Sequence, residues 1–155
     1  MQPITTRPAT LNDLPSLLRF EQGVITAERP FDITIKDTDA NYYDIVEFIT
    51  APHIQLIVAE TDGKLIGSGY ARIEEAKHYL KHQKYAYLGF MYVEPEYRGR
   101  GVNKLVIDSL KQWCLTQNIT ELRLEVYNDN LPAIKAYEKI GFAKMMIKMR
   151  VDISL

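Results

Sequence analysis

The sequence predicts an α/β (α+β) fold in which one central, mixed, mostly antiparallel sheet carries helices on its faces. Two observations lead to this prediction. Stretches with apolar residues at helical spacing alternate along the chain with short runs rich in β-branched and aromatic residues. Glycine or proline punctuates many of the boundaries between them. The expected order is strand, two helices, three strands, helix, strand, helix and strand.

The first fifty residues are expected to form a short edge strand followed by two helices. Thr10 or Asn12 can cap the first helix, which should end before Arg29-Pro30 because the residue before proline disfavours the α region. The second helix is expected to begin at Asp39 and to end at Ala51-Pro52. The apolar positions at helical spacing are Leu14, Leu17, Leu18 and Ile25 in the first helix and Tyr42, Ile45, Val46 and Ile49 in the second.

The rest of the chain is expected to supply most of the sheet. Thr61-Asp62-Gly63-Lys64 has the composition of a hairpin turn between two strands. Asn130 and Gly141 have the residue types that begin and end a short helix. The expected strands are 55–60, 65–74, 85–93, 120–127 and 142–153, and a further helix is expected from 102 to 117.

Composition sets limits on the class of protein. The chain has 155 residues, 46% hydrophobic and 25% charged, as expected for a single soluble domain spanning 1–155. No run of about 18 apolar residues predicts a membrane span. The N-terminus lacks a signal pattern, and the single Cys114 cannot form an internal disulfide. These features favour the cytoplasm, and we expect no membrane partner.

Charge is distributed unevenly along the chain. The net charge of −1 argues against a nucleic-acid partner. Residues 1–76 hold 6 Lys/Arg and 12 Asp/Glu, whereas residues 77–155 hold 13 and 8. This division suits a protein that binds an anionic cofactor on one side and a cationic acceptor on the other.

The segment between the 85–93 strand and the next helix predicts a phosphate cradle. It contains Arg98-Gly99-Arg100-Gly101, followed by Val102-Asn103-Lys104. Glycine permits turns whose backbone N–H groups form an anion nest, and the helix N-terminus adds further donors. The final residues do not match the Gly-Lys-Ser/Thr of a P-loop, and Lys104 replaces the third glycine of the dinucleotide motif.

The six residues from Arg98 to Asn103 resemble the pyrophosphate loop of the GNAT superfamily of acyl-CoA-dependent N-acetyltransferases. Asn103 departs from the Gly or Ala that ends the family's loop. The resemblance continues downstream and covers roughly Gln55 to Ile147. Five residues match the family's second signature in register: Asn130, Ala133, Tyr137, Gly141 and Phe142.

The resemblance implies a GNAT-like single domain whose parallel central strands, 85–93 and 120–127, splay apart to admit the pantetheine arm. It implies transfer of an acetyl group from acetyl-CoA to a primary amine, on a small molecule or a protein, by direct attack on the thioester. Acetyl-CoA is then the cosubstrate, and no metal is expected. The implied cofactor-binding residues are Met91, Tyr92, Val93, Arg98, Gly99, Arg100, Gly101, Val102, Asn103, Lys104, Asn130 and Tyr137.

Catalysis requires an oxyanion site, an acid and a base. The resemblance implies that backbone amides of Met91 to Val93 stabilise the oxyanion and that Tyr137 protonates the leaving thiolate. Glu125 is the first candidate for the base that deprotonates the amine, and Glu94 with a water chain is the alternative. Other family members carry a glutamate at the position of Tyr87, so that version of the base is absent.

The acceptor and the oligomeric state stay open at this point. The acidic excess favours a polyamine, a lysine side chain or a basic small molecule, whereas Arg29 favours an acceptor that bears a carboxylate. Asn103 and the unassigned base leave room for a non-catalytic acyl-CoA-binding module, and plain nucleotide binding is a third reading. A monomer or a homodimer fits the chain. Residues available for the acceptor pocket are Glu21, Glu28, Arg29, Phe31, Tyr42, Tyr43, Tyr70 and Tyr92.

Overall fold

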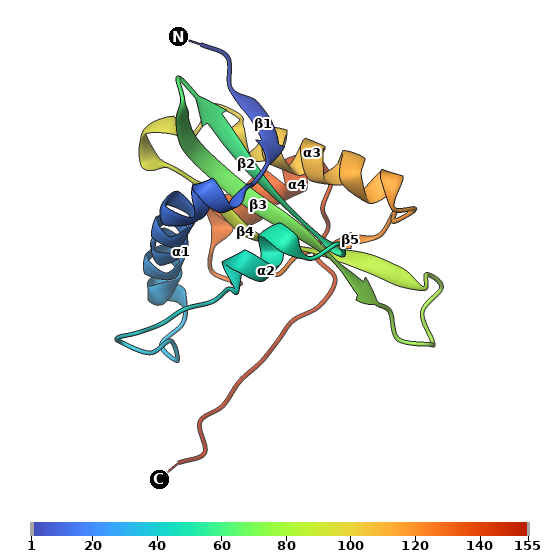
Figure 1. Ribbon diagram of the computed structural model, residues 1–155. Helices are drawn as coiled ribbons and strands as arrows, with labels where there is room; N and C mark the ends of the chain where they lie inside the picture. Colours follow the sequence, from blue (N-terminus) through green and yellow to red (C-terminus); the bar gives the residue numbers. More distant parts are fainter. Residues whose placement is uncertain (1, 155) are drawn as a thin grey trace. The chain divides into compact units, whose positions relative to one another are not determined.

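The computed structural model describes residues 2–154, which divide into two compact units, Met1–Glu125 and Val126–Leu155. That residues 1–155 form a single domain stays a prediction. The first unit contains the sheet and three α-helices, and the second contains one helix followed by an extended segment (Figure 1). No helix within residues 2–154 is both long enough and apolar enough to cross a bilayer.

The sheet has five strands in the order β1-β2-β3-β4-β5. The first four strands pair antiparallel in sequence order, and β5 pairs parallel to β4, so the predicted mixed sheet is confirmed. The elements are β1 (Thr5–Pro8), α1 (Leu14–Glu28), α2 (Ile45–Thr50), β2 (Ile54–Thr61), β3 (Lys64–Glu75), β4 (Lys84–Val93), α3 (Val102–Thr116), β5 (Leu122–Arg123) and α4 (Leu131–Ile140).

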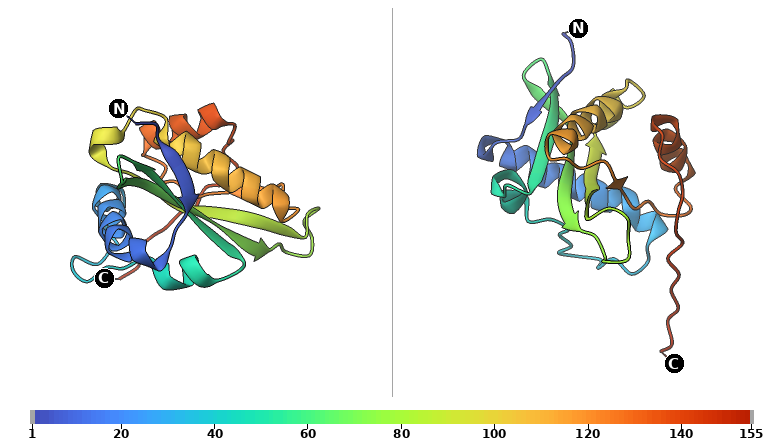
Figure 2. Two further views of the ribbon diagram at one scale, coloured as in Figure 1. Left: turned by 45° about the horizontal axis from the view of Figure 1, so that its top comes forward. Right: turned by 90° about the vertical axis from the view of Figure 1, so that its right-hand side faces the viewer.

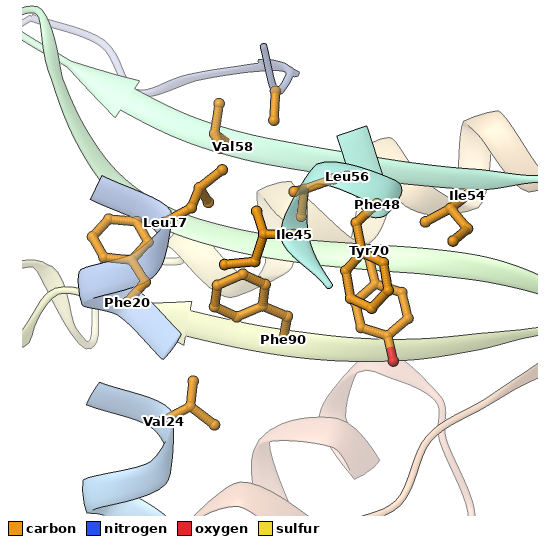
Figure 3. Packing of buried hydrophobic residues seen from close by; sticks show 11 residues of the cluster. Leu17, Phe20, Val24, Ile45, Phe48, Ile54, Leu56, Val58, Tyr70 and Phe90 are labelled. Carbon is orange, nitrogen blue, oxygen red and sulfur yellow. The ribbon is translucent and has the colours of Figure 1, made fainter. Parts of the chain in front are cut away.

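Helices cover both faces of the sheet because successive strand residues point to opposite sides. α1 and α2 lie on one face and α3 on the other (Figure 2). On the α3 face, Gly69 lies against Val106, because a Cβ added to this glycine would approach the valine to 2.8 Å. Figure 3 shows the core of the first face, formed by Leu17, Phe20, Val24, Ile45, Phe48, Ile54, Leu56, Val58, Tyr70 and Phe90.

The second helix is shorter than the sequence predicts. α2 begins at Ile45 rather than Asp39, with Asp44 as its cap. The backbone N–H groups of Tyr42 and Tyr43 donate instead to the buried Glu21 carboxylate, at 2.8 and 2.7 Å. A tertiary partner therefore holds this segment in a non-helical conformation that its apolar spacing could not reveal.

The predicted strand at 142–153 is wrong for the chain as described. No residue from 142 to 154 belongs to a β-ladder, although the segment is extended (Figure 1). Its odd-numbered residues from Met145 to Ile153 are apolar, and all are at least 68% exposed. Alternation gives a segment the pattern of a strand, but a strand also needs a neighbour for its backbone groups. β5 is shorter than the predicted 120–127 for the same reason.

Candidate active site

The turn before α3 has the backbone conformation that the sequence predicts. Gly99 and Gly101 have φ angles of +77° and +79°, in the left-handed region that favours glycine. Gly101 is the N-cap of α3, and its carbonyl accepts the Leu105 N–H at 3.1 Å. A Cβ at either glycine would meet no atom within 4 Å. Conformation rather than crowding therefore calls for glycine here.

The basic side chains of this turn are exposed and already anchored locally. The Arg98 Nε donates to the Val93 carbonyl at 3.0 Å, which ties the turn to the end of β4. The Arg100 guanidinium lies 5.4 Å from the centre of the Tyr97 ring. The Lys104 ammonium pairs with Asp108 at 2.7 Å. Arg98 and Arg100 consequently place positive charge beside the N-terminus of α3.

β4 contains a β-bulge immediately before its end. Ser68 of β3 is matched with Tyr92 and Tyr70 with Gly89, so two residues of β4 face one residue of β3. Phe90, inside the bulge, has a φ of +54°, which is unfavourable for a side chain of this size. The buried Ser68 hydroxyl donates to the Phe90 carbonyl at 2.9 Å and satisfies the displaced group. The amides predicted to bind the oxyanion, Met91 to Val93, lie in and just after this bulge.

The central parallel strands separate early. Within the part of the chain that the structure describes, two residue pairs join β4 and β5, Ala86 with Leu122 and Tyr87 with Arg123. β4 then continues to Val93, six residues further, whereas β5 ends at Arg123. The predicted splaying of the two strands is confirmed.

Glu125 and Tyr87 are neighbours at the point where the strands part. Burial raises the pKa of Tyr87, and the charge of Glu125 together with a hydrogen-bonding interaction with its carboxylate raises it further. The tyrosine therefore stays protonated, and its hydroxyl can donate a hydrogen bond to that carboxylate. Sequence reasoning considered Tyr87 only as the residue that replaces a glutamate of other family members. The alternation of Tyr85 and Tyr87 along β4 is the signal that could have placed both side chains on the same face of the sheet.

Several residues considered for the acceptor pocket are engaged inside the protein. Glu21, 1% exposed, anchors the segment before α2 through the two amides described above. The Arg29 guanidinium donates to the carbonyl oxygens of Lys36 and Asp37, at 2.6 and 3.3 Å. These contacts anchor Arg29 within its own loop, and its role toward a carboxylate of the acceptor stays a prediction.

Two further candidates also have structural partners. The Tyr92 ring centroid lies 4.6 Å from that of Phe20. The Glu94 carboxylate is nearly buried and pairs with Arg19 of α1, so it joins this helix to the end of β4. Glu94 is therefore a weaker candidate than Glu125 for a base that must stay available to substrate.

The second unit confirms the predicted helix boundaries. The Asn130 side chain accepts the Ala133 N–H at 3.4 Å and caps α4, and Gly141 ends it with a φ of +112°. Tyr137 is half-buried, with its ring centroid 5.9 Å from that of Phe142. The cofactor contacts expected of Asn130 and Tyr137, and the acid role of Tyr137, stay predictions.

Comparison with known proteins bears on these observations. The model of the acetyltransferase (GNAT) family matches residues 22–142. The chain belongs to this family. It is therefore an acyltransferase enzyme, and the family assignment made from the two sequence motifs is confirmed.

Relatives and solved structures agree with this assignment. The chain is 30% identical over 147 residues to an N-alpha-acetyltransferase of Sulfolobus acidocaldarius, covering 91% of this chain and 80% of the relative. It is 31% identical over 140 residues to the peptidyl-lysine N-acetyltransferase YiaC of Escherichia coli, covering 88% and 81%. A predicted acetyltransferase of Clostridium acetobutylicum, solved with acetyl-CoA, has a TM-score of 0.72 at 18% identity and 97% coverage of both chains. This structural likeness confirms the fold.

Proposed function

We propose that this GNAT acetyltransferase moves the acetyl group of acetyl-CoA onto the α-amino group at a polypeptide N-terminus by direct attack on the thioester. The observation that carries the proposal is the position of the Glu125 carboxylate, beside Tyr87 where β4 and β5 separate. The similarity to an archaeal N-alpha-acetyltransferase over nine-tenths of the chain supports this choice of acceptor.

In this proposal the glycine turn before α3 binds the pyrophosphate of acetyl-CoA, and the β4 bulge binds its thioester carbonyl. The pyrophosphate lies on the amides between Gly99 and Lys104, where the helix dipole and the arginines favour negative charge. The pantetheine arm follows β4 into the wedge. Amides at the bulge, from Met91 to Val93, then donate to the carbonyl oxygen as it becomes an oxyanion.

The pKa of an α-amino group is low enough for a single carboxylate to serve as the base. An α-amino group has a pKa of about 7.7–8.0, against about 10.4 for lysine, so at pH 7.5 roughly a third of it is neutral instead of roughly a thousandth. The amine nitrogen attacks the thioester carbon, and Glu125 accepts the proton that the nitrogen loses. The C–S bond breaks, and Tyr137 supplies a proton to the departing sulfur.

The test compares thiol release with three kinds of acceptor: a peptide with a free α-amino group, an N-terminally blocked peptide containing lysine, and an aminoglycoside. We expect the first to be consumed with the highest kcat/KM. A preference for lysine would favour the activity of the second relative instead. Tight coenzyme A binding without thiol release from any acceptor would indicate a non-catalytic acyl-CoA-binding module.

Substitutions then test the assigned roles. Glu125→Gln should lower kcat about 100-fold or more, the range of general base catalysis, while coenzyme A affinity stays unchanged. Glu121→Gln is the matched control, because Glu121 immediately precedes β5, four residues before Glu125, and pairs with Arg123. Tyr137→Phe should lower turnover far more than coenzyme A affinity. Intact turnover in Glu125→Gln would show that the base lies elsewhere.

A further inference from the structure

Arg72 is held over the tyrosines of the site by contacts on three sides. It lies on β3 directly opposite Tyr87 of β4. Its guanidinium carbon is 5.5 Å from the ring centres of both Tyr70 and Tyr87. Its Nε donates to Glu74 at 2.5 Å, and its side chain is 33% exposed. The planar guanidinium is thus fixed in place, and the solvent-accessible part of the side chain leaves room for a ligand.

The guanidinium keeps donors for a ligand. Arginine carries five N–H donors in a rigid fork. Glu74 accepts the hydrogen bond from Nε, and the Tyr70 hydroxyl is a further hydrogen-bonding neighbour. The remaining N–H groups can bind an oxygen atom of a molecule that lies against the Tyr87 ring.

The same location contains the proposed base. Tyr87, whose ring Arg72 covers, has its hydroxyl beside the Glu125 carboxylate. Because Glu74 balances the charge of Arg72, the surroundings of Glu125 stay attractive to a cationic amine. The Tyr87 ring separates the Arg72 guanidinium from the proposed base, Glu125. Arg72 is therefore suited to bind an acceptor atom that lies a few bonds from the reacting nitrogen.

We propose that Arg72 binds the carbonyl oxygen of the residue that bears the reacting α-amino group. This inference rests on the proposed function and names the residue that selects for it. In an N-terminal residue a single carbon separates the amino nitrogen from the carbonyl group. A lysine side chain or a polyamine presents only methylene groups at that distance. Binding of such an acceptor would displace water from the Arg72 guanidinium without supplying a hydrogen-bond acceptor in its place.

A purely structural role explains the position of Arg72 less well. The pair with Glu74 joins neighbours on one face of a strand, and both side chains are about one-third exposed. Ion pairs of this kind contribute little to stability. Arginine also suits the recognition of a carbonyl oxygen better than lysine does, because its planar guanidinium stacks on aromatic rings and its N–H donors are thereby held in a fixed orientation.

The experiment uses the full-length protein and two matched acceptors, a short peptide and its isostere in which an E-alkene replaces the first peptide bond. KM and kcat are measured for both with the wild type, Arg72→Leu and Arg72→Lys. Arg123→Leu is the control, because Arg123 stacks 5.0 Å from the Tyr85 ring and pairs through Nε with Glu121 at 3.1 Å. Arg123 therefore has the same kinds of contact as Arg72, on β5 at the other side of β4.

We expect Arg72→Leu to raise KM for the peptide about 10- to 100-fold, the effect of losing a hydrogen bond to a charged group, and to leave KM for the isostere unchanged. Arg72→Lys should recover part of the loss, and Arg123→Leu should leave the ratio of the two KM values as in the wild type. Urea unfolding checks that each variant is folded, and Arg72→Lys alone suffices if the leucine variant is not.

Two outcomes would overturn the inference, and they differ from failure of the proposed function. An equal change of KM for both acceptors would show that Arg72 acts through stability or general charge. No change for either would show that it does not contact the acceptor. In both cases the wild type still acetylates the peptide. A wild type that consumes no amine at all would instead refute the proposed function together with the role of Arg72.

Discussion

Gly101 shows how one backbone torsion can determine a binding site. Its left-handed φ turns the chain so that the amides at the start of α3 are presented together. Gly63, in the hairpin between β2 and β3, has nearly the same conformation, with a φ of +72°. Neither position has an atom within 4 Å of an added Cβ. The two glycines therefore meet the same conformational demand, one beside the cradle and the other in the β2–β3 hairpin.

This equivalence leads to a prediction about coenzyme A binding. Gly101→Ala and Gly63→Ala should each cost about 1–2 kcal/mol of unfolding free energy, because each places a Cβ in the left-handed region. Only Gly101→Ala should weaken coenzyme A binding, by about tenfold. Urea unfolding measures the first quantity, and calorimetry measures the second. Equal coenzyme A affinities for the two variants would remove the cradle from its proposed role.

Among the elements, the start of α1 is secured by a charged contact to β1. Both Asp13 carboxylate oxygens accept from the terminal nitrogens of Arg7, at 2.8 and 2.9 Å. Asp13 also accepts the Thr10 N–H at 2.8 Å in a capping box. Thr10, one of the two caps expected from sequence, therefore begins this helical region with the help of a residue that the sequence does not single out.

This contact predicts a pH-dependent contribution to stability. Arg7 holds the pKa of Asp13 below its ordinary value of 3.8. A carboxyl group with a lowered folded-state pKa stabilises the protein above its unfolded pKa and loses that contribution as pH falls through the folded value. Asp13→Asn should thus cost about 1.5–3 kcal/mol at pH 7 and progressively less below pH 4.

Urea unfolding of both proteins between pH 7 and pH 3 measures this difference. Asp44→Asn is the control, because Asp44 caps α2 at 3.1 Å from a more exposed site and asparagine caps equally well. A difference between wild type and Asp13→Asn that stays constant with pH would contradict the assignment.

On the scale of the molecule, the sheet and the segment after α4 differ in how their backbone groups are paired. β2, β3 and β4 are paired along most of their length and are packed between helices. The segment from 143 to 153 has the alternation of a strand, five apolar side chains on one face, and no ladder of its own. Its backbone N–H groups consequently have no strand partner within residues 2–154.

Hydrogen exchange should resolve this contrast. Amides from 143 to 153 should exchange at rates close to those of an unfolded chain, whereas the interiors of β2 to β4 should be protected by several orders of magnitude. Mass spectrometry on peptide fragments, at two protein concentrations, measures both regions in one experiment. Protection of the segment comparable to that of β3 would contradict the expectation, and a dependence on concentration would indicate a second copy as the partner.

The sequence by itself determined the features that depend on local chemistry. These are the hairpin at Asp62-Gly63, the cap and stop of α4, the glycine turn before α3 and the family to which the chain belongs. Each rests on residues within a few positions of one another, where a torsion, a missing Cβ or a short capping side chain decides the conformation.

Only the tertiary structure decided the features that depend on distant partners. Glu21 fixed the start of α2, a register shift produced the bulge at Phe90, and strand pairing placed Arg72 opposite Tyr87, the neighbour of Glu125. Arg29 was taken by carbonyl oxygens of its own loop. The physical reason is common to all of them: a polar group binds whichever partner the packed chain places within reach, and sequence spacing does not encode that distance.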